Sequence, residues 1–148
     1  MRLINSIHLN VFIKEEEDSA KIAEVMRALI PLNLEKEKLS TKKQSATGFN
    51  EKKIVILAIT LEKERHLKAF MDHLFLNLGD RQKELLVRQA DSRLDEELNF
   101  FLRLDKDRLL SGEYWITDSG NCFHLKINIA AFPRKRELAL DLVKKIFS

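Results

Sequence analysis

The cationic side chains near the carboxyl end of the chain are the ones most able to do chemistry. Arg134, Lys135 and Arg136 follow Pro133 and open the last predicted helix. A helix start exposes free backbone amides and the positive end of the helix dipole, so cations there slightly weaken the helix unless they hold an anion. Arginine, lysine and backbone amides also contact phosphates. The run therefore predicts a phosphate site, and an exposed first turn without a ligand is the alternative.

Polar side chains in rows on the predicted strands form another set. They are His124, Lys126 and Asn128 in the last strand, Ser6, His8 and Asn10 in the first, and Phe101 and Arg103 in a third. These rows offer donors, acceptors, cations and a stacking ring, which are the groups that read single-stranded RNA. An antiparallel sheet commonly keeps one face in water, so an ordinary solvated face is the alternative. The order of the strands decides between the two.

A lysine-rich segment over residues 36–53 is a second candidate for contact with a phosphate backbone. Its lysines are Lys36, Lys38, Lys42, Lys43, Lys52 and Lys53. Only Glu37 and Glu51 oppose them, whereas the net charge of the whole chain is only +3. A net charge that small does not indicate a polyanionic partner, so the local excess carries the argument. A solvated loop beside a lysine-protected edge strand is the alternative.

Catalytic patterns are weak by comparison. Cys122 and His124 lie two residues apart on a strand and share a face, as a thiol and imidazole pair would. A nucleophile also needs an orienting group and an oxyanion site, and no motif supplies them. His66 and His73 lie roughly 10 Å apart along a helix, too far for one metal ion. The four glycines form no phosphate-cradling loop. We therefore expect a binding protein without cofactor or metal, and not an enzyme.

The elements that position these residues follow from hydrophobic periodicity. Strands are predicted over 3–13, 39–47, 52–61, 98–104, 114–116 and 122–132, and helices over 19–31, 67–75, 80–95 and from Pro133 onward. The strand over 39–47 is expected at an edge, and the strand over 52–61 at the centre with both faces covered. Asp80 is the expected N-cap of its helix. This order predicts an α+β fold, with a largely antiparallel sheet and helices mainly on one face.

Composition sets the limits of the interpretation. The chain of 148 residues is 45% hydrophobic and 33% charged, which fits one domain over residues 1–148 with a core of its own. A single cysteine excludes an internal disulfide, and the first ten residues lack the pattern of an export signal. The longest apolar run, Ile54 to Ile59, is far shorter than the ~20 residues of a membrane-spanning helix. We expect a cytoplasmic protein without membrane contact.

Two segments carry a resemblance to a known family. They are FLRLDK over residues 101–106, and AFPRKRE over residues 131–137 after HLKINI. In these segments the chain resembles archaeal RNA-binding proteins described as exosome-subunit-like. The resemblance extends to the first strand, the first helix and IVILAITLEKER, and so covers most of the chain. It implies a fold similar to that of a large-subunit ribosomal protein that contacts ribosomal RNA.

The resemblance also implies RNA binding in RNA metabolism or processing, without catalysis. The matching residues that would touch RNA are Arg103, Lys106, His124, Lys126, Arg134, Lys135 and Arg136, and charge alone adds Lys42 and Lys43. Exosome-related or ribosome-related proteins are the expected protein partners, and a homodimer is left open. The alternative is a protein-interaction or structural subunit that uses an open sheet face or the edge over residues 39–47.

Overall fold

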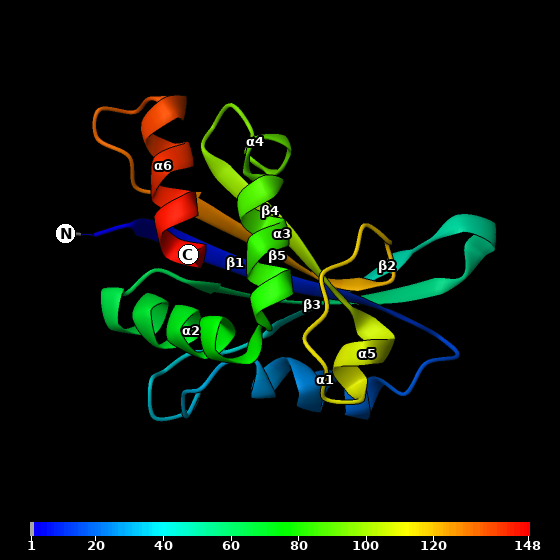
Figure 1. Ribbon diagram of the computed structural model, residues 1–148. Coiled ribbons are helices and arrows are strands. Elements are labelled where there is room, and N and C mark those ends of the chain that lie inside the picture. Colours follow the sequence, from blue (N-terminus) through cyan, green and yellow to red (C-terminus); the bar gives the residue numbers. More distant parts are fainter. Residues whose placement is uncertain (1) are drawn as a thin grey trace.

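The computed structural model describes residues 2–148, which form five strands and six α-helices (Figure 1). The strands are β1 (Ile4–Lys14), β2 (Lys42–Thr47), β3 (Lys53–Leu61), β4 (Asn99–Asp105) and β5 (Cys122–Ile129). The helices are α1 (Ser19–Ala28), α2 (Glu64–Asn77), α3 (Asp80–Arg88), α4 (Ala90–Arg93), α5 (Lys106–Leu110) and α6 (Arg136–Phe147), and a short 3-10 turn, η1 (Phe49–Glu51), joins β2 to β3.

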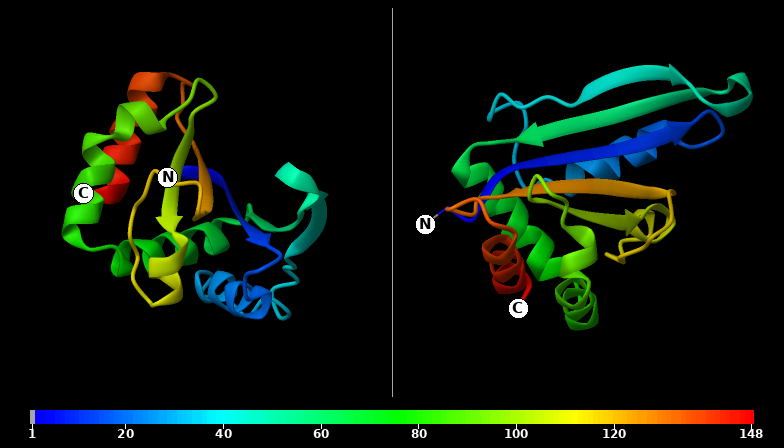
Figure 2. Two further views of the ribbon diagram at one scale, coloured as in Figure 1. Left: turned by 90° about the vertical axis from the view of Figure 1, so that its right-hand side faces the viewer. Right: turned by 90° about the horizontal axis from the view of Figure 1, so that it is seen from above.

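The strands form one antiparallel sheet in the order β2-β3-β1-β5-β4. The two side views place the helices on one side of this sheet, and the β2–β3 hairpin projects beyond them (Figure 2). This arrangement confirms the predicted α+β class, the antiparallel sheet and the covering of one face. It also supplies the strand order that the sequence leaves open.

Strict alternation in β1 explains why this strand can lie in the middle of the sheet. Ile7, Leu9 and Val11 are buried beneath the helices, whereas His8 and Asn10 between them lie on the other face. Because antiparallel partners point to the same face, pairing of β1 with both β3 and β5 aligns their apolar sets in one core. The core therefore lies between the sheet and the helices.

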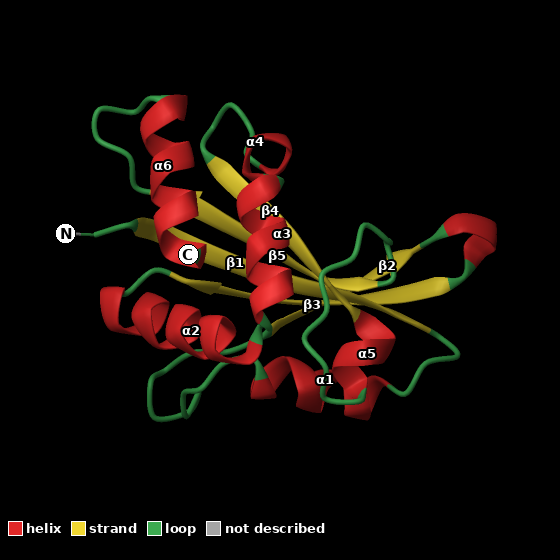
Figure 3. Ribbon diagram, viewed as in Figure 1, coloured by secondary structure: helices red, strands yellow, loops and turns green. Residues whose placement is uncertain are grey.

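The helices lie over the sheet (Figure 3), and the residues that they bury follow ordinary helical spacing. Helix α2 buries Phe70 and Leu74, and α6 buries Val143 and Phe147. Helix α1 begins after Asp18, whose side chain accepts a hydrogen bond of 3.1 Å from the backbone N–H of Lys21. Such a cap satisfies one of the free amides at a helix start. Among residues 2–148, none of the helices combines the length and the apolar composition needed to cross a bilayer.

Six local features differ from the sequence prediction. Strand β3 lies second in the sheet instead of at its centre, and it is covered on one face only, because the helices lie on the side of its buried residues Leu57 and Ile59. The helix predicted over 80–95 is divided into α3 and α4 at Gln89, and its N-cap is Gly79 instead of Asp80. Residues 105–112, which connect two of the predicted strands, contain the helix α5, which the sequence pattern does not predict. Residues 114–116 form a single bridge instead of a strand. Helix α6 begins at Arg136, with Lys135 as its N-cap.

Candidate nucleic-acid interface

The face of the sheet opposite the helices, here called the open face, brings the predicted polar rows together. From β4 across to β2 it carries Phe101, Arg103, His124, Lys126, Asn128, Ser6, His8, Asn10, Phe12, Ile56, Ala58, Thr60, Lys42 and Gln44. Because β1, β5 and β4 are adjacent, three rows that are far apart in the sequence become one surface.

Strand register sets these side chains in two lines across the sheet. In the first line Arg103 pairs with His124, His124 with Asn10, Asn10 with Ala58, and Ala58 with Lys42. In the second line Phe101 pairs with Lys126, Lys126 with His8, and His8 with Thr60. Neither line contains a carboxylate. The open face therefore combines cations, imidazoles and a ring without an acidic side chain between them.

The two imidazoles of the open face have perturbed protonation. Burial lowers the pKa of His124, and the nearby charges of Arg103, His8 and Lys126 lower it further. Burial and then Lys126 lower the pKa of His8, whose Nδ1 lies 2.9 Å from the Thr60 hydroxyl. The common cause is partial removal from water beside cations, which disfavours the charged imidazolium. Both imidazoles are therefore mostly neutral at pH 7 and act as hydrogen-bonding groups.

An asparagine cluster joins the cationic run at residues 134–136 to one end of the open face. The Asn128 amide donates to Asn99 Oδ1 at 2.8 Å and accepts from Asn5 at 2.9 Å. Asn128 and Arg134 both donate to the Glu97 carbonyl, at 3.3 and 3.1 Å. The shared carbonyl places the Arg134 guanidinium beside Asn128, so Arg134 extends the open face.

The other two cations of this run differ in their surroundings. Lys135 is exposed, and no side chain caps the helix at this position. Arg136 donates to the backbone carbonyls of Asp91 at 2.6 Å and Leu94 at 2.9 Å, and its guanidinium pairs with the Asp91 carboxylate at 3.1 Å. Arg136 therefore ties the start of α6 to α4. Its hydrogen bonds already occupy much of its donor capacity.

Lys106 occupies a position that does not agree with its predicted place on an RNA surface. Only 2% of the residue is exposed, and its ammonium donates to the Phe12 carbonyl at 2.7 Å and pairs with Glu17 at 3.1 Å. Burial works against an ionised Glu17, but hydrogen bonds from the Lys14 backbone and from Lys106 lower the pKa of Glu17 overall. Lys106 therefore stabilises the connection between β1 and α1, and its ammonium is not on the open face.

The two candidate lysines of the edge strand, Lys42 and Lys43, point to opposite faces of the sheet. Lys42 pairs with Ala58 and lies on the open face, whereas Lys43 pairs with the buried Leu57 and lies on the side of the helices. Alternation requires this, since successive side chains of a strand point to opposite faces. Of the two, Lys42 alone belongs to the open face.

Three exposed aromatic side chains were not among the predicted site residues. Phe12 is 52% exposed in β1, although alternation places it in the polar row, which was an available signal. Phe132 is 97% exposed and stands two residues before Arg134. Trp115 is 39% exposed, with the Arg108 guanidinium 4.1 Å from its ring. Trp115 lies beside the end of β4, because its carbonyl accepts from the Asp105 N–H at 2.8 Å. The exposure of Phe132 and Trp115, in contrast, depends on packing that periodicity does not reveal.

The thiol and imidazole pair considered for catalysis has unfavourable surroundings. Cys122 is buried, and burial raises the pKa of its thiol despite the lowering effect of Arg103 and Lys106. A raised pKa reduces the fraction of reactive thiolate. Within the part of the chain that the structure describes, no three His, Cys, Asp or Glu side chains gather as a metal site would require.

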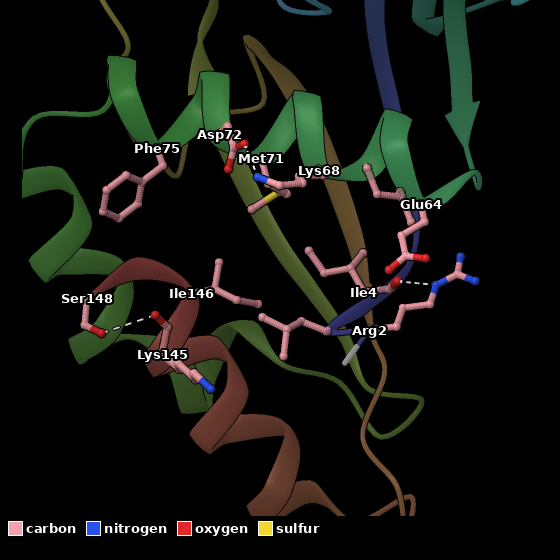
Figure 4. Close-up of a pocket in the computed structure, with 12 residues that line it drawn as sticks. Arg2, Ile4, Glu64, Lys68, Met71, Asp72, Phe75, Lys145, Ile146 and Ser148 are labelled. Carbon is pink, nitrogen blue, oxygen red and sulfur yellow. Dashed lines mark hydrogen bonds and ion pairs between the residues drawn. The ribbon is translucent and has the colours of Figure 1, made fainter.

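An apolar pocket of about 500 Å³ lies on the other side of the molecule, between α2, α6 and the start of β1. Met71, Ile146 and Ile4 face it, and Lys68 pairs with Asp72 at its rim (Figure 4). The side chain of Arg2 donates to the Ile4 carbonyl at 2.8 Å. Arg2, Lys68 and Asp72 are thus engaged with each other or with the backbone, and the lining is mostly apolar, so the open face is the stronger candidate site.

Comparison with known proteins adds independent information. A family model described as RNA binding matches residues 6–129. An RNA-binding protein of Pyrococcus abyssi is 23% identical over 95% of this chain and 92% of its own length. A DUF54 protein of Methanothermobacter thermautotrophicus has a solved structure that is 32% identical, with a TM-score of 0.79 over 99% of both chains. A solved protein of Archaeoglobus fulgidus has a TM-score of 0.85 at 24% identity, over 97% of this chain and 99% of its own.

Proposed function

The chain belongs to the family described as RNA binding, and from that membership we propose that its open face holds single-stranded RNA. The observation that carries the proposal is the pair of lines across β4, β5, β1 and β3, which set Arg103, Lys126 and two histidines beside Phe101. Cations there would contact phosphates, and the ring would stack on a base. We treat residues 1–148 as one binding module.

Unpaired RNA suits this surface better than a duplex does. A-form duplexes are recognised mostly through shape, phosphates and 2′-hydroxyls, because their bases are stacked and their deep groove is narrow. The open face offers Phe101 and the exposed Phe12, which can engage only bases that are free to unstack. Five strands at about 4.8 Å spacing span roughly 19 Å, room for a short stretch of extended strand.

Binding without catalysis is the role that we propose in RNA metabolism or processing. Support comes from the buried Cys122 thiol, with its raised pKa, and from the resemblance to exosome-subunit-like proteins. The resemblance favours exosome-related or ribosome-related proteins as partners. Affinity purification of the tagged chain from native lysate, with and without ribonuclease, would test this. Partners that survive ribonuclease treatment would support direct association, and loss of all partners would contradict it.

RNA binding itself is tested by fluorescence anisotropy with a labelled 20-nucleotide single strand and a duplex of equal length. We expect tighter binding of the single strand. The logarithm of affinity should fall linearly with the logarithm of salt, with a slope of about −3 for some four neutralised phosphates. No detectable binding at 50 mM salt, or equal affinity for the duplex, would contradict the proposal. Unchanged affinity after charge reversal at Lys126 and Arg134 would show that the site is elsewhere.

A protein-binding role is the second candidate, favoured by the apolar part of the open face. Phe12, 52% exposed, is opposite Ile56, and the neighbouring β2 is an edge strand. Edge strands can pair with another chain, although Lys42 and Lys43 on this one discourage it. Light scattering after ribonuclease treatment would detect a homodimer. A dimer that Phe12→Ser disrupts, together with absence of RNA binding, would favour this role.

A further inference from the structure

A hollow of about 560 Å³ lies beside the open face, at the outer edge of β4. One wall is β4 itself, with Phe101 and Arg103. The other wall comes from the end of α3, from α4 and from the turn after residue 117, which supply Arg93 and Asp118. The hollow thus shares Phe101 and Arg103 with the open face, whereas its second wall comes from segments outside the sheet.

The two guanidiniums of this hollow, from Arg93 and Arg103, are held in place by other residues of the chain. Arg93, whose side chain is only 11% exposed, donates from Nη2 and Nε to Gln89 Oε1 at 2.6 and 3.0 Å. Its Nη2 also lies 3.4 Å from Asp118 Oδ1. Arg103 donates to the Asp118 carbonyl at 2.9 Å. Two guanidiniums held by the same turn form a prearranged site, which lowers the entropy cost of binding.

The charges of the hollow balance, which favours a neutral ligand group over a phosphate. Arg93 and Arg103 are matched by Asp95 and Asp118. The Asp95 carboxylate is already engaged, because it accepts from the backbone N–H groups of Glu97 and Asn99 at 2.9 and 2.8 Å. The Asp118 side chain is 90% exposed, and its contact with Arg93 is a long one. Asp118 therefore keeps acceptor capacity for a ligand.

We propose that this hollow binds a guanine base of the single-stranded RNA, an inference that rests on the proposed function. The ring of Phe101 stacks on the base, and the Asp118 carboxylate accepts from N1–H and from the exocyclic amine. Arg93 donates to O6 from Nη1, whose hydrogen bond to the Phe101 carbonyl is long at 3.5 Å. Guanine is the base that presents two adjacent donors beside an acceptor on its Watson–Crick edge. Uracil presents one donor between two acceptors, and adenine and cytosine each present one amine beside an acceptor, so a carboxylate next to a guanidinium suits them less well.

The test uses oligouridylate 12-mers that carry one central guanosine, inosine or adenosine. Inosine lacks the exocyclic amine and so removes one of the two donors to Asp118. We expect wild-type protein to bind the guanosine oligomer roughly tenfold more tightly than the adenosine oligomer, the ratio typical of a bidentate base contact, with inosine between them. Asp118→Asn should abolish this preference while binding of plain oligouridylate is retained or strengthened by the lost negative charge.

Asp72→Asn is the matched control, because Asp72 also pairs with a cation, Lys68, but on α2 at the helix side. It makes the same change of charge and should keep the preference for guanosine. No binding of any oligomer by wild type would defeat the proposed function. Binding without a preference for guanosine, or a preference that survives Asp118→Asn, would overturn the guanine site and leave RNA binding by the open face intact.

Discussion

The rings of Phe101 and His124 lie beside each other on adjacent strands, with centroids 5.6 Å apart and planes inclined by 43°. Arg103 pairs with His124 in the same register. A stacking ring (Phe101), a titratable imidazole (His124) and a fixed cation (Arg103) therefore lie within one short stretch of β4 and β5. A base on Phe101 would bring its own phosphate close to the other two groups.

We expect the histidines of the open face to make RNA binding dependent on pH. Burial and neighbouring cations lower the pKa of His8 and His124, so both are mostly neutral at pH 7. A phosphate nearby favours the imidazolium, so binding takes up protons and affinity should rise as the pH falls from 7.5 to 5.5. Anisotropy should show a smaller rise for His124→Gln. His73→Gln, on α2, serves as the control and should keep the wild-type profile.

The same pKa shifts act on folding with a defined sign. Because the folded pKa values of His8 and His124 lie below the ordinary value of 6.5, the unfolded chain binds protons more readily. Their contribution to stability is present above pH 6.5 and is lost as the pH falls through the folded values. Affinity must therefore be measured where circular dichroism shows the protein folded. A flat affinity profile between pH 7.5 and 5.5 would argue against these histidines lying near phosphate.

Lys106→Met should affect stability and leave RNA binding intact. The change removes the buried ammonium that holds the Phe12 carbonyl and Glu17. Removing one partner of a largely buried pair leaves the other uncompensated, so the free energy of unfolding should fall by about 3 kcal/mol. Urea denaturation measures this, and Lys68→Met, which breaks an exposed pair on α2, should cost under about 1 kcal/mol. Weaker RNA binding by folded Lys106→Met would restore Lys106 to the interface.

Lys42 and Lys43 provide a test of which face binds. They are adjacent and both exposed, but Lys42 lies on the open face and Lys43 on the helix side. Lys42→Gln should weaken binding and reduce the steepness of the salt dependence by roughly 0.7, as expected for one lost phosphate contact to a single strand. Lys43→Gln should change neither. Equal effects of the two substitutions would indicate a nonspecific attraction to charge.

Arg134 and Arg136 should also have different roles, the first in RNA affinity and the second in stability. Arg134→Gln removes an exposed cation beside Asn128 and should lower RNA affinity with little change in stability. Arg136→Gln removes the contacts of α6 with Asp91 and Leu94, and should lower the free energy of unfolding by about 1 kcal/mol. Parallel denaturation and anisotropy measurements on the two variants separate these roles. The opposite pattern, with Arg136 as the affinity residue, would contradict the assignment.

The alternating strands show how much of the fold can be predicted from the sequence. In β1 and β5, period-two patterning is enough to assign the faces of His8 and His124 correctly, because each strand has one buried face. The same reasoning fails for strand β3. Its open-face residues Ile56 and Ala58 are apolar without being covered by helices, so its continuous apolar run wrongly predicts a strand buried on both faces.

The site residues were harder to predict, because charge alone does not show where a side chain points. Lys106 follows the strand of Arg103 directly, yet the turn into α5 directs its ammonium inward to Glu17. The hollow at β4 is built from Arg93 and Asp118, which are 25 residues apart and meet only through tertiary contacts. Short-range sequence patterns cannot predict a contact of this kind, because it forms only when the chain folds.

The central claim is that the open face binds single-stranded RNA, and one comparison tests it most directly. Phe101→Leu with Lys126→Gln removes a ring and a cation from this face, whereas Leu76→Ala with Lys144→Gln removes an exposed apolar side chain and a cation from the helix side. Affinity for a single-stranded 20-mer at 100 mM salt should fall at least about tenfold for the first pair, since stacking on one base is worth ~1–3 kcal/mol. The second pair should bind as wild type does. Equal affinity of the two double variants would contradict the claim.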